Sequence, residues 1–268
     1  MTPDGERVDS VSSDRVPSAD FASASVVRPP SAVQLPFTVR IVRTEEHLSK
    51  AVVVRAKTYS RHHPELAQQL QSPEAADRAP FALVLLAESK SDSAALGTMR
   101  IETNTSTPQP VESLLPSNSA FTARTIAYVT RLGVHRGSDA PLVKLALFKA
   151  LHRYCLACQI DWIVVTARPP MDRQYVKLGF ADVFPPNTLI PIPWSSAIET
   201  RILALETIAA ERQWREARHP LYKFMIEDFT PDIQIFSSVS GAWGRPRATP
   251  TPPPSTATLV EFFGVTVV

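Results

Sequence analysis

The segment from Tyr128 to Tyr154 constrains the fold most, because its hydrophobic pattern changes from one period to another within a few residues. Residues 125–134 mix β-branched and aromatic side chains, which is typical of a strand. Apolar residues between Leu142 and Cys155 then recur at helical spacing. A strand, a short polar loop and a helix are therefore expected in this order.

The loop between this strand and this helix is a candidate anion site. Ser138 or Asp139 suits the N-cap of the helix, and Pro141 suits its first turn, where a backbone N–H is not needed. Free N–H groups at a helix start attract phosphate, and His135 and Arg136 add donors beside them. The alternative for this segment alone is an ordinary connection between a strand and a helix.

The rest of the chain predicts antiparallel strands first and a parallel β-α-β unit later, which makes a mixed α+β fold. The expected elements are a strand at 37–44, a helix from 45 that Pro64 stops, a hairpin over 81–103, a buried strand at 161–167, a short helix that turns at Gly179 into a strand near 181–184, and a long helix over 196–217.

Composition predicts one folded domain between two irregular ends. Residues 1–34 are rich in Ser, Pro, Asp and Ala without a sustained period, and we expect a disordered segment there. Residues 237–268 are expected to form a proline-rich tail, which leaves the domain at 35–236. A hydrophobic content of 44% is enough for a substantial core.

Charge and apolar runs exclude several classes of protein. The net charge is +2 with no long basic run, so no nucleic acid partner is expected. No apolar stretch is long enough to span a membrane, and the acidic start lacks the apolar core of a signal peptide, so we expect a cytoplasmic protein. Cys155 and Cys158 are interpreted as packing residues, and no metal site is indicated.

Four short motifs carry a family resemblance. In order they are "VRAKTY", "EAAD", "GTMRIET" followed by "VESLLP", and "VTRLGV". Their order and spacing resemble those of the acyl-homoserine-lactone synthases and the related N-acyl amino acid synthases, a branch of the Gcn5-related N-acetyltransferase (GNAT) superfamily. The resemblance covers about Val39 to Phe184.

The resemblance implies a GNAT-like fold, in which a mixed central sheet is flanked by helices and a pantetheine arm lies between two splayed central strands. It also implies transfer of a fatty acyl group to the amino group of an amino acid or a similar small amine. The donor would be an acyl carrier protein (ACP), as a protein partner, or acyl-CoA. Both are substrates, so no permanently bound cofactor is expected.

The resemblance further implies which residues bind the acceptor. Arginines at three motif positions would suit an acceptor that carries a carboxylate, because guanidinium can hold a carboxylate through two parallel hydrogen bonds. The acidic residues are expected to orient these arginines. The matched residues are Arg55 and Tyr59 in the first helix, Glu74 and Asp77 in the acidic motif, Arg100 in the third strand and Arg131 in the central strand.

Aminolysis of a thioester needs a deprotonated amine and a proton for the leaving thiolate. Tyr175 stands where many members of the superfamily carry a tyrosine that donates this proton, although a core packing role is the alternative. Glu102 lies two residues from Arg100 on the same strand face, so it is either the base or a salt-bridge partner of that arginine. His62 and His63 are further candidates for the base. We list Arg100, Glu102 and Tyr175 as the catalytic candidates.

Four residues of the strand end and the loop are expected to bind the phosphopantetheine of the donor: Val134, Arg136, Gly137 and Ser138. A backbone N–H between Val129 and Val134 could polarise the thioester carbonyl, particularly if a bulge splays the sheet. The loop "HRGSDA" departs from the superfamily's glycine-rich phosphate loop, since it has one glycine.

A second departure concerns Tyr128, which stands where lactone synthases carry a glutamate. The loss of this acid weakens the lactone-synthase interpretation and favours another amine acceptor. A conventional acetyltransferase that uses acetyl-CoA is disfavoured by the phosphate loop and by the match at Arg55. The alternative from another class is a catalytically degenerate module on the same fold that binds an acyl chain or a protein.

Overall fold

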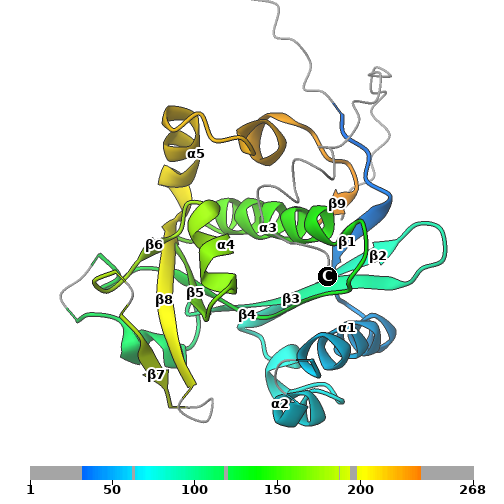
Figure 1. The fold of residues 1–268 in the computed structure, drawn as a ribbon, viewed down its shortest axis with the longest axis horizontal. Helices are drawn as coiled ribbons and strands as arrows, with labels where there is room; N and C mark the ends of the chain where they lie inside the picture. The colour runs from blue at the N-terminus through cyan, green and yellow to red at the C-terminus, as the bar shows by residue number, and fades with distance from the viewer. Residues whose placement is uncertain (1–31, 62–63, 118–119, 187, 194–197, 237–268) are drawn as a thin grey trace, which may run out of the picture.

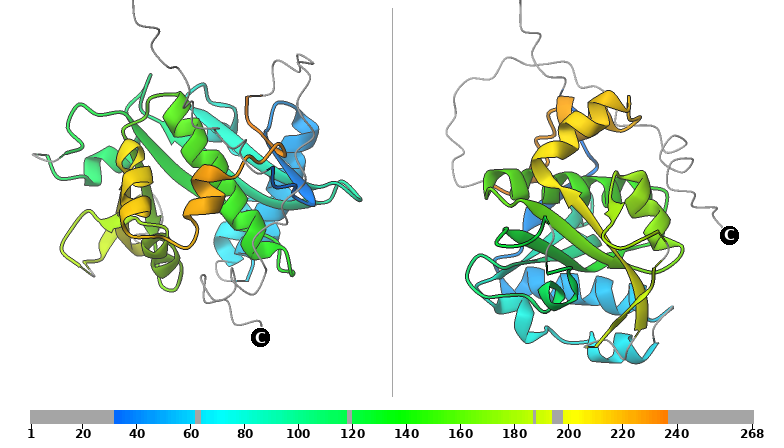
Figure 2. Two further views of the ribbon diagram at one scale, coloured as in Figure 1. Left: turned by 90° about the horizontal axis from the view of Figure 1, so that it is seen from above. Right: turned by 90° about the vertical axis from the view of Figure 1, so that its left-hand side faces the viewer.

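The computed structural model describes residues 32–61, 64–117, 120–186, 188–193 and 198–236. A central β-sheet separates two layers of helices (Figure 1). Helix α1 (Glu45–Tyr59) and helix α2 (Pro64–Gln69) lie on one face, and helix α3 (Ala140–Ala157) crosses the other face together with α4 (Met171–Lys177) and α5 (Thr207–Glu216). The two further views in Figure 2 show the same layers from above and from the side.

The strands of the described residues belong to a mixed sheet with the order β6-β8-β5-β4-β3-β2-β1-β9, and β7 pairs with β8 outside this path. Their bounds are Phe37–Ile41 for β1, Ala82–Ser89 for β2, Ala95–Thr103 for β3, Ile126–Val134 for β4, Trp162–Ala167 for β5, Ala181–Asp182 for β6, Ile190–Ile192 for β7, Ile198–Glu206 for β8 and Ile233–Gln234 for β9. Short helices η1 (Ala75–Arg78), η2 (Pro110–Leu114) and η3 (Lys223–Glu227) complete the elements.

The pairing confirms the mixed α+β class. Strands β2 and β3 form the expected antiparallel hairpin, and β4 and β5, joined by α3, are parallel. The parallel pairing begins at Ile126 opposite Trp162 and ends at Val129 opposite Val165. Beyond this point β4 continues without β5 as its partner, so the two central strands separate there.

A β-bulge lies in the separated part of β4. Arg100 of β3 pairs with Thr130, and Thr98 pairs with Gly133, so β4 has one residue more than β3 over this stretch. Arg131 accommodates the extra residue with a φ of 54°, in the left-handed region. Because few residues other than glycine adopt this conformation, the surrounding contacts must hold Arg131 in place.

The helices begin where the sequence supplies the capping groups. Thr44 caps α1, since its hydroxyl accepts the N–H of His47, and Glu45 and Glu46 occupy the positive end of the helix dipole. Helix α3 has Asp139 at its N-cap position and Pro141 in its first turn. Gly97 allows α3 to approach β3, because a Cβ at Gly97 would lie 2.6 Å from a methyl of Val143.

Two helical predictions differ from the structure. The long helix expected over 196–217 is wrong, because Ile198–Glu206 forms strand β8 and only Thr207–Glu216 is helical. Leu203 and Leu205 face the α3 core, whereas Ile202 and Ala204 face the opposite core. Since both faces of β8 are buried, its sequence lacks the alternation that marks a half-buried strand. Pro64, expected to stop a helix, begins α2.

The largest apolar core lies between the sheet and α3. Packing in the described chain begins before residue 35: Val33 is fully buried, and its N–H donates to the carbonyl of Phe229 at 2.8 Å. The rest of the expected N-terminal segment (1–31) and the proline-rich tail (237–268) lie outside the described residues. Among the described helices, none combines the length and apolarity needed to cross a bilayer.

Candidate active site

The candidate site lies where β4 bulges and parts from β5. Side chains on the α1 face of the sheet alternate with those of the α3 core, so Arg100 and Glu102 of β3 and Tyr128 and Thr130 of β4 share the α1 face. Helix α1 packs on β3 and β4 over this face, and Arg100 reaches η1 through its hydrogen bond to Asp77. The sheet and the two helical elements thus surround a polar cluster inside the domain.

Glu74 is the centre of the cluster and joins three elements. Its carboxylate accepts two hydrogen bonds from Arg131, both at 2.7 Å, in a bidentate arrangement. Arg100 Nη1 donates to Oε2 of Glu74 at 2.9 Å, and Arg55 Nη1 lies 3.9 Å from the same oxygen. The three arginines therefore converge on one carboxylate of the protein itself.

Asp77 holds the innermost arginine. Both of its carboxylate oxygens accept from Nη1 of Arg55, at 2.7 and 2.8 Å, and one also accepts the backbone N–H of Glu74. Asp77 has a fully buried side chain, and that of Arg55 is 1% exposed. Burial lowers the pKa of Arg55, and the charge of Asp77 offsets part of this effect. The acids thus orient the arginines, as expected.

The cluster is electrically balanced. Arg55, Arg100 and Arg131 face three carboxylates, because Glu102 Oε1 accepts from Arg100 Nε at 2.7 Å. Thr130, which sequence analysis did not single out, joins this pair: its hydroxyl donates to Glu102 at 2.9 Å and accepts from Arg100 at 3.1 Å. Glu102 is therefore seen as the salt-bridge partner of Arg100, one of the two roles expected for it.

Ion pairing also sets the protonation of Glu74. Burial alone would raise the pKa of this carboxyl, but the hydrogen bonds and charge of Arg131, with the charges of Arg100 and Arg55, bring the pKa down to about 2. Burial lowers the pKa of Arg131, but the hydrogen bond and the charge of Glu74 together outweigh it, so the pKa of this guanidinium is raised. Glu74 and Arg131 are consequently a fully charged pair at neutral pH.

Arg55 keeps hydrogen-bonding capacity that the cluster does not use. Its Nε and Nη2 are buried and have no hydrogen-bond partner among the described residues. These two nitrogens form one edge of the planar guanidinium, the edge that can hold a carboxylate through parallel bonds. A buried, unpaired edge of this kind is unfavourable without a partner.

Three tyrosines, Tyr59, Tyr128 and Tyr175, influence one another electrostatically. Tyr128 donates to or accepts from Thr166 across the two strands, with 2.9 Å between the hydroxyls. Tyr175 belongs to α4, and its ring packs edge-on against Phe148 at 5.5 Å. Burial raises the pKa of Tyr175, and the nearby Tyr59 and Tyr128 raise it further. The phenols from both faces of the sheet are thus within electrostatic range of one another.

These surroundings keep the phenols neutral. Burial raises the pKa of Tyr128 above its ordinary value of 10.0, and the pKa of Tyr59 is raised by the same cause. Position 128 consequently presents a neutral, hydrogen-bonded hydroxyl group where lactone synthases are expected to carry a carboxylate. Tyr175 has the packed ring that was one of the two roles expected for it, and its phenol lies within electrostatic range of Tyr59 and Tyr128.

The expected donor loop lies at the start of α3 on the surface. Val134 ends β4 opposite Gly97, while Arg136, Gly137 and Ser138 are exposed. Asp139 occupies the N-cap position, but its carboxylate makes no capping hydrogen bond. Asp139, one of the two residues expected at the N-cap, therefore has the expected position without the capping bond.

Positive charge gathers beside this loop. Burial lowers the pKa of His135, and the charges of Lys57 and Arg61, at the end of α1, lower it further. His135 is therefore neutral at neutral pH, and the positive charges of Lys57, Arg61 and Arg136 form a basic rim beside the N-terminal end of α3. His62 and His63, the alternative bases, lie outside the described residues.

No protein-family model and no curated protein matches this chain. Among solved structures, it is similar to FeeM, an N-acyl amino acid synthase from uncultured soil microbes. The TM-score is 0.54 with 17% identity, over 70% of this chain and 97% of that one.

Two homoserine-lactone synthases show weaker similarity. LasI gives a TM-score of 0.49 with 18% identity over 64% of this chain and 90% of that chain. The CoA-dependent enzyme BjaI, solved with S-adenosylmethionine and isopentyl-CoA, gives 0.48 with 16% identity over 69% and 90%. The overlay with the N-acyl amino acid synthase confirms the GNAT-like acyltransferase fold that the motifs predicted.

Proposed function

We propose that this protein is an N-acyltransferase that moves a fatty acyl group from acyl carrier protein or acyl-CoA to the amino group of an amino acid or similar small amine. One arrangement carries the proposal. At the point where β4 bulges and leaves β5, a charge-balanced arginine cluster lies on one face of the sheet, and Tyr175 approaches from the other. The similarity in fold to an N-acyl amino acid synthase supports it.

The donor enters from the α3 side in this proposal. The basic rim of Lys57, Arg61 and Arg136 suits the phosphate of a pantetheine arm or an acidic carrier protein, and the neutral imidazole of His135 lies beside it. The arm then extends along the part of β4 that no longer pairs with β5. A backbone N–H there polarises the thioester carbonyl. Val134 at the end of β4 and the loop residues Gly137 and Ser138 line the entrance for the pantetheine arm.

The acceptor binds on the α1 side. Its carboxylate pairs with the unused edge of Arg55, which relieves the two unpaired guanidinium nitrogens. Glu74 and Asp77 keep Arg100 and Arg131 in position, and Tyr59 lies next to these charges. Because Tyr128 is neutral, the proposed acceptor is an amine that does not require a carboxylate at this position.

The chemical step is direct aminolysis. The amine nitrogen attacks the thioester carbonyl carbon, a C–N bond forms and the C–S bond breaks. The leaving thiolate takes the phenol proton of Tyr175, the nitrogen releases its extra proton to water, and the phenolate recovers a proton from solvent. Because burial raises the pKa of Tyr175, its phenol carries the proton throughout the neutral range.

A test compares acyl carrier proteins and acyl-CoA donors of several chain lengths with a mixture of amino acids, and follows N-acyl products by mass spectrometry. The wild-type protein should form an N-acyl amino acid, and the Tyr175→Phe variant, which keeps the packed ring, should form much less. Release of free thiol without an N-acyl product would indicate a hydrolase and contradict the proposal.

The alternative is a catalytically degenerate module that binds an acyl chain or a protein partner. The small apolar cavity behind Tyr175, about 10 Å³, favours the protein-binding form of this alternative, because a fatty chain cannot enter without side-chain movement. Acyl-chain binding without any turnover across the donor panel would support this alternative.

A further inference from the structure

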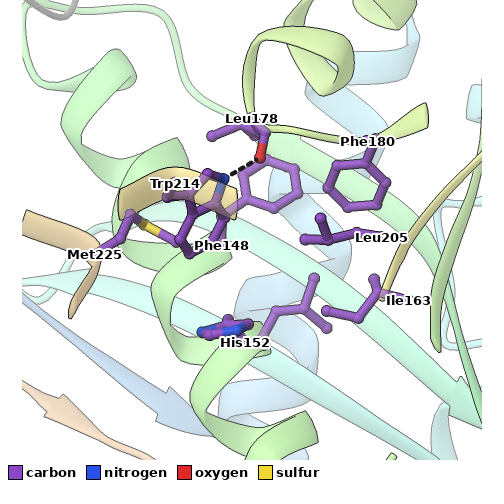
Figure 3. A pocket seen from close by; sticks show the side chains of 9 residues that line it. Phe148, His152, Ile163, Leu178, Phe180, Leu205, Trp214 and Met225 are labelled. Carbon is purple, nitrogen blue, oxygen red and sulfur yellow. Dashed lines mark hydrogen bonds between the residues drawn. The ribbon is translucent and has the colours of Figure 1, made fainter. Parts of the chain in front are cut away.

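An apolar cavity lies between α3, β5, β8 and the terminal helices, on the α3 side of the sheet (Figure 3). Its walls include Phe148 of α3, Ile163 of β5 and Trp214 of α5. Met225 of η3 closes it from the outer side, and the thioether arm is drawn beside Trp214 and Phe148. The volume open to the centre of a water molecule is about 10 Å³, which is room for a single water.

A side chain that lines the cavity is in contact with a residue of the candidate site. Phe148, one of its walls, contacts Tyr175 with the ring centroids 5.5 Å apart. Along β5, Ile163 lies two residues before Val165, where pairing with β4 ends, a step of about 7 Å on the same strand face. An acyl chain whose carbonyl lies in the gap reaches the cavity by passing the ring of Tyr175.

Most walls of the cavity are held rigidly. Trp214 donates its indole N–H to the carbonyl of Leu178 at 2.9 Å, and His152 shares a hydrogen bond with the carbonyl of Thr207 at 3.1 Å. Phe148 and Ile163 belong to long elements inside the main core. These side chains cannot retreat without breaking hydrogen bonds or core contacts.

Met225 differs from the other walls. Its side chain is unbranched and flexible, so it can change rotamer without disturbing the backbone. The backbone of η3 is fixed on both sides of it, because buried Lys149 donates to the carbonyls of Phe224 and Asp228. η3 is a π-helix, a conformation that is uncommon and often found at functional sites. Met225 is thus a movable group on an anchored support.

We propose that the cavity receives the distal end of the acyl chain and that Met225 determines how long a chain it accepts. This inference rests on the proposed acyltransferase function. The ligand class is a saturated or nearly saturated fatty acyl group, since the residues that line the cavity are almost all apolar. Entry of the chain moves the thioether arm of Met225 outward while η3 stays in place.

The test measures kcat/KM for saturated acyl donors of increasing length with the acceptor that the wild-type protein prefers. Met225→Ala should shift the optimum to longer chains and raise the ratio of kcat/KM for long over short donors roughly tenfold. Met225→Phe should shift the optimum to shorter chains. A variant that is merely destabilised would lose activity with all donors and would not give opposite shifts.

Leu221→Ala is a matched control, because Leu221 is equally buried in the same terminal segment and does not line the cavity. It should leave the length profile unchanged. If the wild-type protein transfers acyl groups but both Met225 variants keep its profile, this inference is wrong and the proposed function stands. If the wild-type protein transfers no acyl group of any length, the proposed function itself fails.

A second readout does not depend on turnover. Binding of fatty acids of increasing length, measured by calorimetry on the full chain, should show the same opposite shifts in the two variants. Equal affinities of the wild-type protein and both variants at every length would also overturn the inference.

Discussion

Arg100 and Glu102 hold one another on a single face of β3, with Nε of the arginine 2.7 Å from Oε1 of the glutamate. The pair is possible because residues two apart on a strand point in the same direction. Both side chains are largely buried, so each charge depends on the other for compensation. This relationship explains why a carboxylate lies near the acceptor side without being available as a simple base.

Replacing Glu102 with glutamine tests this role. Glu102→Gln leaves the buried cluster with three arginines and two carboxylates, so one positive charge is uncompensated, and the free energy of unfolding should fall by about 3 kcal/mol in urea titrations. Glu216→Gln, at an exposed position of α5, should change it by less than about 0.5 kcal/mol. Unchanged stability together with a complete loss of turnover would instead identify Glu102 as the base.

Tyr175→Phe separates the hydroxyl group from the ring. The ring contacts with Phe148 and Phe180 remain, so the variant should fold normally. Loss of the proton donor should lower kcat by roughly 100-fold with little change in KM for the acceptor. Tyr222→Phe, whose hydroxyl accepts from Arg215 at the surface, should keep full activity. Equal rates for all three proteins would reduce Tyr175 to a packing residue.

Much of the fold could be predicted from sequence because local patterns agreed with tertiary packing. The β4-α3-β5 unit carries β-branched residues, then helical spacing, then an apolar run, and each element formed as expected. β8 could not be predicted, since it is buried on both faces and composed largely of good helix formers. Its partner β5 supplies the hydrogen bonds that override local preference.

The site was predictable in its charged residues but not in its geometry. The motifs indicated Arg55, Glu74 and Asp77, and the structure brings them together. No local signal shows that Arg131 adopts a positive φ, because the bulge depends on the register between β3 and β4. Thr130 was missed because a threonine within a strand has no distinctive pattern.

Acid should weaken the protein through Glu74. Its pKa in the folded protein is about 2, below the value of an unfolded chain, so its stabilising contribution is complete above pH 4.5 and is lost as the pH falls toward 2. Glu74→Gln should therefore flatten the decline in unfolding free energy over this range, at the cost of lower stability at pH 7. Urea titrations at several pH values measure both effects. An equally steep decline in the variant would contradict the assignment.

Lys149 should also make stability rise with pH, but in a higher pH range. Burial, with the charge of Arg153, lowers its pKa to about 7, so folding disfavours the charged amine. The unfolded chain binds the extra proton between about pH 7 and pH 10, and stability should rise with pH across this window. A neutral amine still has two N–H groups for the carbonyls of Phe224 and Asp228.

Lys149→Met tests this assignment. The variant should lose part of the rise in stability above pH 7, although Lys144, whose pKa is lowered to about 8 by burial, contributes in the same direction. Thermal unfolding between pH 6 and pH 10 measures the difference. A rise identical to that of the wild-type protein would mean that Lys149 titrates normally.

The basic rim beside the donor loop should control donor affinity through charge. The double variant Arg61→Ser/Arg136→Ser removes two exposed positive charges of the rim. The KM for an acyl carrier protein should then rise several-fold at low salt. The difference should shrink toward 1 M salt, where charges farther apart than about 3 Å are screened. Arg212→Ser, an exposed arginine on α5, is the matched control. A neutral pantetheine thioester without phosphate should show no change, because it has no charge for the rim to attract. If the double variant impaired this neutral donor as strongly as the carrier protein, the rim would be shaping the loop rather than attracting the donor.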